Sequence, residues 1–158
     1  MPILLKKLYD YNKQYELKSM QWQRRLRGNS EHIEWGGAKL RMMMQCIYTI
    51  AFLCLLRFDK VLPIELKDIE VIDNERGQIK LTLPFRKTHQ YGGISTSSTF
   101  TSLEIKPFHL FFNRKELHLD PIHHLLRWMA ASRLVSGPLF RQVDTADRVI
   151  IDGNKALV

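Results

Sequence analysis

The chain has 158 residues, of which 45% are hydrophobic and 25% are charged. This length and composition are ordinary for one soluble globular domain with a buried core. The formal net charge of +8 favours a polyanionic partner such as nucleic acid, although an excess of lysine also serves solubility alone. The longest apolar stretch, residues 42–56, is too short to cross a bilayer, which excludes a membrane span.

Two further observations speak against export. The N-terminal stretch MPILLKKLYDYNKQ carries charges inside its apolar patch and has no cleavage site, so it is not a secretory signal. Cys46 and Cys54 lie on one predicted helix, about 12 Å apart along its axis, which is too far for a disulfide. We therefore expect reduced core thiols in an intracellular protein that is not secreted.

Residues 1–37 are predicted to form a basic helical segment. Leucines and tyrosines recur at roughly helical spacing through residues 1–26, with lysines and arginines between them. Gly28, Gly36 and Gly37 interrupt this pattern. By itself the pattern is that of an amphipathic basic helix, or two, with a solvated lysine-rich face.

A buried helix is predicted to start near Ala38. Between residues 42 and 56 only Gln45 and Thr49 are polar. A helix that is apolar on every side lies inside a domain rather than on its surface.

Arg57 follows this helix directly. A guanidinium that is dehydrated without a partner is strongly destabilising. We therefore expect Arg57 either to pair with Asp59 or Glu65, or to bind an anion.

A small antiparallel sheet is predicted next. Residues 65–68 make one helical turn, and the first strand begins at Ile69. Turn-forming residues at 73–77 and the apolar alternation in 78–83 complete a β-hairpin. A long polar loop follows, and the third strand lies near residues 103–112.

The last predicted helix has Asp120 as its N-cap and Pro121 in its first turn, and Gly137 followed by Pro138 ends it. A short buried strand, SGPLF, comes next, and residues 144–158 form a tail. Together these elements predict an α+β fold that is mostly helical, with a small three-stranded antiparallel sheet. The predicted core-facing stripe of the last helix consists of Ile122, Leu125, Leu126, Met129, Ala130 and Leu134.

The stretch that follows the buried helix carries a family resemblance. An arginine that ends an apolar helix, then VLPIELKDIEV, then strands ending in FRKTHQYGG, resemble the first half of a tyrosine recombinase catalytic domain, as in fungal mobile elements. In that family the helix-to-strand turn reads L-x-x-x-D-[IV], and Leu66, Asp68 and Ile69 keep most of it. One position departs, because the family has an acidic residue where this chain has Lys60. The resemblance implies that residues 38–143 are an incomplete catalytic domain of a DNA breaking-rejoining enzyme. It also implies that residues 1–37 are the tail of the DNA-clamping core-binding domain, or a linker into the catalytic domain.

The resemblance also implies roles for four residues. Arg57 would hold two oxygens of the phosphate with its planar guanidinium. Lys87, on the hairpin, would give a proton to the leaving oxygen. Arg86 and His89 would add phosphate contacts that position the DNA. Plainer interpretations stay open, with Arg57 as a helix-end cation and Lys87 as a surface lysine beside its competitor Arg86.

The second half of the family's active site is missing from the sequence. A His-x-x-Arg pair and a tyrosine nucleophile should follow SGPLF, yet the last histidine is His124 and the last tyrosine is Tyr91. The string from His124 to Arg127 precedes SGPLF, so we do not assign it to that pair. His123 and His124 diverge by about 100° on a helix, and no cluster of cysteines or carboxylates accompanies them, so we expect no metal site.

We therefore expect a truncated protein of DNA recombination or integration that does not cut DNA and retains binding to its phosphate backbone at most. We expect no cofactor, no membrane contact and a nuclear or other intracellular location, and the sequence leaves room for a homo-oligomer on DNA. The alternatives are a non-catalytic DNA-binding module, or an interaction or scaffold domain whose basic surface is incidental.

Overall fold

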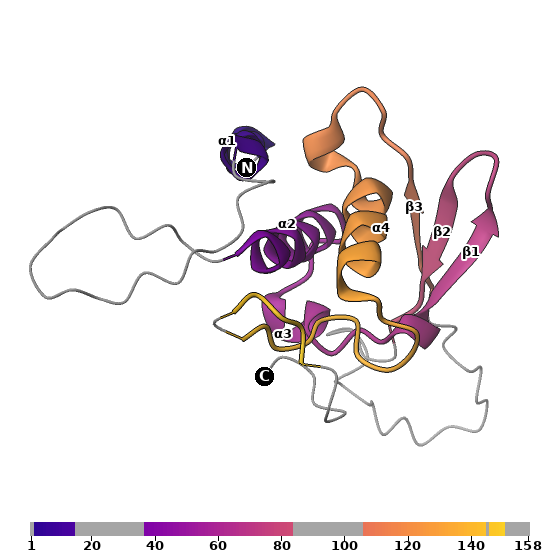
Figure 1. Ribbon diagram of the computed structural model, residues 1–158. Helices are drawn as coiled ribbons and strands as arrows, with labels where there is room; N and C mark the ends of the chain where they lie inside the picture. Colours follow the sequence, from indigo (N-terminus) through magenta and orange to yellow (C-terminus); the bar gives the residue numbers. More distant parts are fainter. Residues whose placement is uncertain (1, 15–36, 84–105, 145, 151–158) are drawn as a thin grey trace, which may run out of the picture.

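The computed structural model describes residues 2–14, 37–83, 106–144 and 146–150. These residues form helices and one small antiparallel sheet, which confirms the predicted α+β class (Figure 1). No helix in these ranges is long and apolar enough to span a membrane. In chain order the elements are α1 (Pro2–Gln14), α2 (Ala38–Leu53), α3 (Phe58–Val61), η1 (Leu66–Asp68), β1 (Ile69–Asp73), β2 (Gln78–Leu81), β3 (Phe108–Phe111), η3 (Leu117–Leu119) and α4 (Pro121–Ser132).

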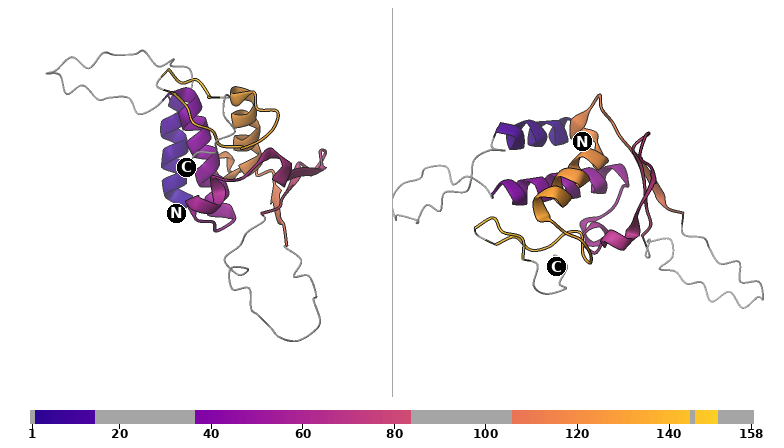
Figure 2. Two further views of the ribbon diagram at one scale, coloured as in Figure 1. Left: turned by 90° about the horizontal axis from the view of Figure 1, so that it is seen from below. Right: turned by 45° about the vertical axis from the view of Figure 1, so that its right-hand side comes forward.

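Helix α2 runs through the middle of the structure, with α1 alongside it and α4 crossing it (Figures 1 and 2). It begins at Ala38, as predicted. Residues 45–47 are all buried, and since consecutive helical residues differ by about 100°, its neighbours cover most of its circumference. Trp128 of α4 and Phe140 are fully buried in the same core. The apolar pattern thus predicted the burial of this helix correctly, but the helix ends at Leu53, and Leu55 of the same apolar stretch is 89% exposed.

The sheet has the strand order β1-β2-β3, and both strand pairs are antiparallel, as predicted. Ile79 and Leu110 pair on the core-facing side and are buried. Val71 pairs with Ile79 on the same face but is 59% exposed, so the core covers β2 and β3 better than β1. β3 begins at Phe108, and residues 103–105 of the predicted strand lie outside the described residues.

Helix α4 begins as predicted but ends earlier. The Asp120 carboxylate accepts hydrogen bonds from two backbone N–H groups of the first turn, at 3.0 and 2.9 Å, which confirms it as the N-cap. The helix ends at Ser132, so the predicted end at Gly137 is wrong. Arg133 adopts a left-handed φ of 53° while its N–H still donates to the carbonyl of Met129, and this conformation closes the helix without a glycine.

The buried face of α4 also differs in part from the predicted stripe. Leu126 is 53% exposed and Ala130 is exposed, whereas the rest of the stripe is buried or half-buried. His124, Trp128 and Ser132, spaced by four residues, are buried instead. The indole N–H of Trp128 donates to a backbone carbonyl of the SGPLF segment at 2.9 Å. This segment packs against the Trp128 side of the helix and so turns that side inward.

The SGPLF segment pairs with the chain just after α3. Pro138 forms an isolated antiparallel bridge with Glu65, flanked by two backbone hydrogen bonds of 2.8 and 3.0 Å. Leu139 and Phe140 are fully buried. The predicted short strand is therefore a single bridge, which ties the end of α4 to the stretch that follows Arg57.

Helix α1 is the described part of the predicted basic segment. It lies beside α2 in both views of Figure 2, and Leu5 is its buried residue. Ile3 and Leu4 point outward, with 73% and 63% of their surface exposed. Residues 15–36, which contain the predicted breaks, lie outside the described residues.

Candidate functional site

The turn that presents Arg57 is formed by the backbone at the end of α2. Leu55 has a left-handed φ of 51°. Its N–H donates to the carbonyl of Phe52 at 3.3 Å, and the N–H of Leu56 donates to the carbonyl of Ala51 at 2.8 Å. These two bonds make a Schellman motif, which satisfies the last carbonyls of the helix and reverses the chain. Arg57 therefore does not bind those carbonyls as a helix-end cation.

Arg57 is the N-cap residue of α3, and its side chain is 75% exposed. Its Nε donates to Asp59 Oδ1 at 3.1 Å and its Nη2 donates to Asp59 Oδ2 at 3.3 Å. This pair raises the pKa of Arg57 and lowers the pKa of Asp59. Of the alternatives from the sequence, pairing with Asp59 is the one observed, and Glu65 pairs with Lys67 instead, at 2.8 Å. Arg57 is thus a solvent-facing cation with one carboxylate partner.

The other three predicted site residues lie between residues 84 and 105, outside the described residues. The N–H of Thr82 donates to the carbonyl of Asp68 at 2.8 Å, so the connection from β2 to β3 starts beside η1. Whether the side chains of Arg86, Lys87 and His89 approach Arg57 stays a prediction.

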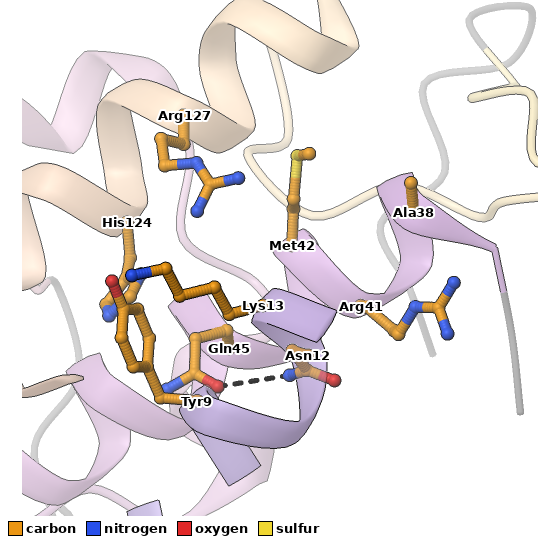
Figure 3. Close-up of a pocket in the computed structure, with 9 residues that line it drawn as sticks. All are labelled: Tyr9, Asn12, Lys13, Ala38, Arg41, Met42, Gln45, His124 and Arg127. Carbon is orange, nitrogen blue, oxygen red and sulfur yellow. Dashed lines mark hydrogen bonds between the residues drawn. The ribbon is translucent and has the colours of Figure 1, made fainter. Parts of the chain in front are cut away.

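A second site, which the sequence reasoning missed, lies where α1, α2 and α4 meet (Figure 3). The space that a water molecule can enter there is about 20 Å³, close to the size of one water. We call it the three-helix pocket. It is lined by Tyr9, Asn12, Lys13, Ala38, Arg41, Met42, Gln45, His124 and Arg127.

Polar atoms without partners are concentrated in the three-helix pocket. His124 is 3% exposed and Gln45 is 4% exposed. Asn12 Nδ2 donates to Gln45 Oε1 at 3.2 Å. Among the described residues, His124 Nε2, Gln45 Nε2 and Asn12 Oδ1 have no hydrogen-bond partner. Buried polar atoms are rarely left unpaired, so each of these atoms needs an explanation.

Burial and charge both act on the His124 imidazole. The pKa of His124 is lowered to about 4: burial is the largest cause, the neighbouring charges of His123 and Arg127 act in the same direction, and hydrogen bonds to the backbone of Leu117 and His118 oppose the shift. Tyr9 packs edge-on against the ring, with 5.6 Å between ring centroids. His124 is therefore neutral at physiological pH.

Part of the three-helix pocket was visible in the sequence. Gln45 is one of two polar residues in an apolar helix, and His124 and Arg127 form the string that we set apart from the family's pair. The structure places all three around one pocket. The contribution of α1 had no sequence signal, because nothing local shows which face of α2 it packs against.

The described residues show no metal site. No group of three or more histidine, cysteine or acidic side chains within them could hold a metal ion. Cys46 and Cys54 are buried free thiols, as predicted, and burial raises the pKa of Cys46. Comparisons of the chain with family models, curated proteins and solved structures find no match.

Proposed function

We propose that this chain binds the phosphate backbone of DNA in the nucleus, as part of a tyrosine-recombinase-type protein of DNA recombination or integration. The observation that carries the proposal is the position of Arg57. It is exposed on the turn that ends a buried helix, and it precedes a three-stranded antiparallel sheet whose β2–β3 connection contains Lys87. The proposal covers binding and not strand cleavage.

The electrostatics of Arg57 support this role. Its partner Asp59 is itself 49% exposed, so water and salt screen the pair and a phosphate can replace the carboxylate at little cost. The guanidinium already makes two parallel hydrogen bonds to Asp59, which is the geometry it uses with two phosphate oxygens. The net charge of +8 adds a long-range attraction for DNA.

The test is duplex binding by fluorescence anisotropy across a salt series. We expect binding at ~50 mM salt that weakens steeply by ~200 mM, because each phosphate contact releases counterions. Arg57→Ala and Lys87→Ala should each weaken binding and lower the salt slope by about one. Absence of binding at ~50 mM salt would refute the proposal.

Arg148→Ala is the matched control. Arg148 is 78% exposed and donates through Nε to Asp144 at 2.9 Å, so its exposure and pairing resemble those of Arg57. It lies near the start of α2, whereas Arg57 follows its end, about 24 Å away along the helix. Equal weakening by Arg148→Ala and Arg57→Ala would mean that the whole basic surface, and not the Arg57 turn, attracts DNA.

One observation favours the second candidate, an interaction domain. Val71, Ile72 and Phe111 on the sheet are 59%, 46% and 54% exposed, and apolar side chains of this size are often covered by a protein partner. In that case Arg57→Ala and Lys87→Ala would leave duplex binding unchanged.

A further inference from the structure

Three of the nine residues that line the three-helix pocket are positively charged. Lys13, Arg41 and Arg127 line it, and none of the nine described lining residues is aspartate or glutamate. In Figure 3 the ammonium of Lys13 extends toward His124, and the guanidinium of Arg127 points toward the same space, whereas Arg41 points away from His124. A negatively charged group at the His124 side of the pocket would therefore be attracted by two side chains from different helices.

Two buried nitrogens on residues that line the pocket have no described partner. The hydrogen bond from Asn12 occupies Gln45 Oε1, which leaves Gln45 Nε2 as an unused donor on the side of Tyr9 and His124 (Figure 3). His124 Nε2 is the second such nitrogen, and His124 is only 3% exposed. The third unpaired atom, Asn12 Oδ1, points away from His124 (Figure 3).

The chemistry of His124 decides what these nitrogens can bind. Its ring is hydrogen-bonded to the backbone of Leu117 and His118, which leaves Nε2 as the ring nitrogen without a described partner. In the neutral ring Nε2 is an acceptor, and in the protonated ring it is a donor. The nearest acidic residue on α4 is the buried Asp120, one turn before His124, and its carboxylate accepts hydrogen bonds from backbone N–H groups. The other titratable and charged groups that surround His124 from α1, α2, η3 and α4 are Tyr9, Lys13, Arg41, His118, His123 and Arg127.

The size of the pocket limits the ligand. A space of about 20 Å³ holds one oxygen atom rather than a whole molecule. The remainder of a ligand would stay at the mouth, beside the exposed side chain of Lys13. This arrangement suits one terminal oxygen of a tetrahedral oxyanion.

We propose that the three-helix pocket binds a phosphoryl or sulfuryl oxyanion, one oxygen of which accepts hydrogen bonds from Gln45 Nε2 and from protonated His124. Lys13 and Arg127 attract the anion at the mouth. Binding is coupled to the uptake of one proton by His124, because the negative charge of the bound anion stabilises the protonated imidazole ring. The proposal does not involve Arg57, so it stands or falls apart from the DNA-binding role of that residue.

The test uses sulfate as the probe, because its charge is constant between about pH 5 and pH 8. The ¹⁵N signals of the histidine rings of the full chain report protonation at each sulfate concentration, and His124→Gln assigns the signal of His124. We expect sulfate to protonate His124 near pH 6 and the apparent Kd to rise about tenfold per pH unit above the pKa of the complex. A His124 ring that stays unprotonated at saturating sulfate would overturn the proposal.

Substitutions on α1 separate the pocket from general charge. Lys13→Ala should weaken sulfate binding several-fold, and Lys6→Ala should not, although both lysines are exposed on the same helix. Both variants keep His124, so they remain informative if His124→Gln does not fold. Equal weakening by Lys6→Ala would count against a defined site. Arg57→Ala should leave the protonation of His124 by sulfate unchanged.

The source of the oxyanion is decided by two further probes in the same measurement. Protonation of His124 by inorganic phosphate but not by a short DNA duplex would identify a free phosphate or a small phosphorylated ligand. Protonation by the duplex would identify a backbone phosphate and add a second contact to that of Arg57. Failure of sulfate, phosphate and duplex alike would refute the pocket, and a salt-dependent Arg57 effect on duplex binding would still leave the DNA proposal in place.

Discussion

The two ends of α2 are closed by different means. The C-terminal end is closed by its own backbone, through the left-handed conformation of Leu55. At the N-terminal end the cap residue Gly37 has no side chain, and the Asp147 carboxylate accepts hydrogen bonds from the N–H groups of Lys39 and Leu40 at 2.9 and 3.1 Å. One closure is therefore local in sequence, and the other exists only in the folded chain.

The same contrast separates the two candidate sites. Arg57 follows the locally closed end, is exposed, and finds its partner Asp59 two residues away. The three-helix pocket flanks the N-terminal half of α2, is buried, and depends on α1 and α4. A site built by local structure is visible in a sequence pattern, whereas a site built by packing is not.

The largest expected effect is a loss of stability in acid, which tests the burial of His124 in the three-helix pocket. The ordinary pKa of histidine, 6.5, applies to the unfolded chain, and burial lowers the pKa of His124 to about 4 in the fold. Between these values the unfolded chain binds a proton that the folded chain does not, so the free energy of unfolding falls as the pH falls. The loss reaches about 3 kcal/mol near pH 4. Urea unfolding followed by tryptophan fluorescence at pH 7 and pH 4.5 measures it.

His124→Gln is the control for this pH effect. The variant should lose much less stability between pH 7 and pH 4.5. Protonation of carboxyl groups whose pKa is lowered, such as Glu70 beside Lys80, also lowers the free energy of unfolding in acid. This loss occurs at lower pH and is the same in the wild-type protein and in His124→Gln. The same pH dependence in both proteins would show that His124 is not the group responsible.

The next largest effect concerns the tertiary cap of α2. Asp147→Ala removes both acceptors from the first turn and should lower the free energy of unfolding by about 1–2 kcal/mol. Gly37→Ala should act on the same contact, because a Cβ at Gly37 overlaps the Asp147 carboxylate. The double variant should therefore cost less than the sum of the two single changes. Strict additivity in urea unfolding would contradict a shared contact.

The smallest effect concerns the local closure. Leu55 is 89% exposed in a left-handed conformation, which costs a non-glycine residue roughly 1–2 kcal/mol. Leu55→Gly removes this strain but adds freedom to the unfolded chain, so the net gain should be about 1 kcal/mol or less. Thermal unfolding should show a Tm that is higher by a few degrees. Leu53→Gly, inside the last turn of α2, is the control and should be destabilising.

Local patterns in the sequence determined much of the fold. The start of α2 near Ala38, its burial, the β1–β2 hairpin and the Asp120 cap were all predicted correctly, because each depends on hydrogen bonds or periodicity within a few residues. The free thiols of Cys46 and Cys54 were predicted for the same reason, since helical geometry sets their separation. The pairing of Arg57 with Asp59 was among the alternatives that the sequence allowed.

The tertiary structure decided the remainder. The sequence predicted that Leu126 faces the core, but the SGPLF segment packs against the other side of α4 and buries Trp128 and His124. Asp147 lies in the stretch predicted as a tail, yet it caps a helix that begins more than a hundred residues earlier. Burial and capping between distant segments depend on where those segments pack, and no local pattern of side chains encodes that position.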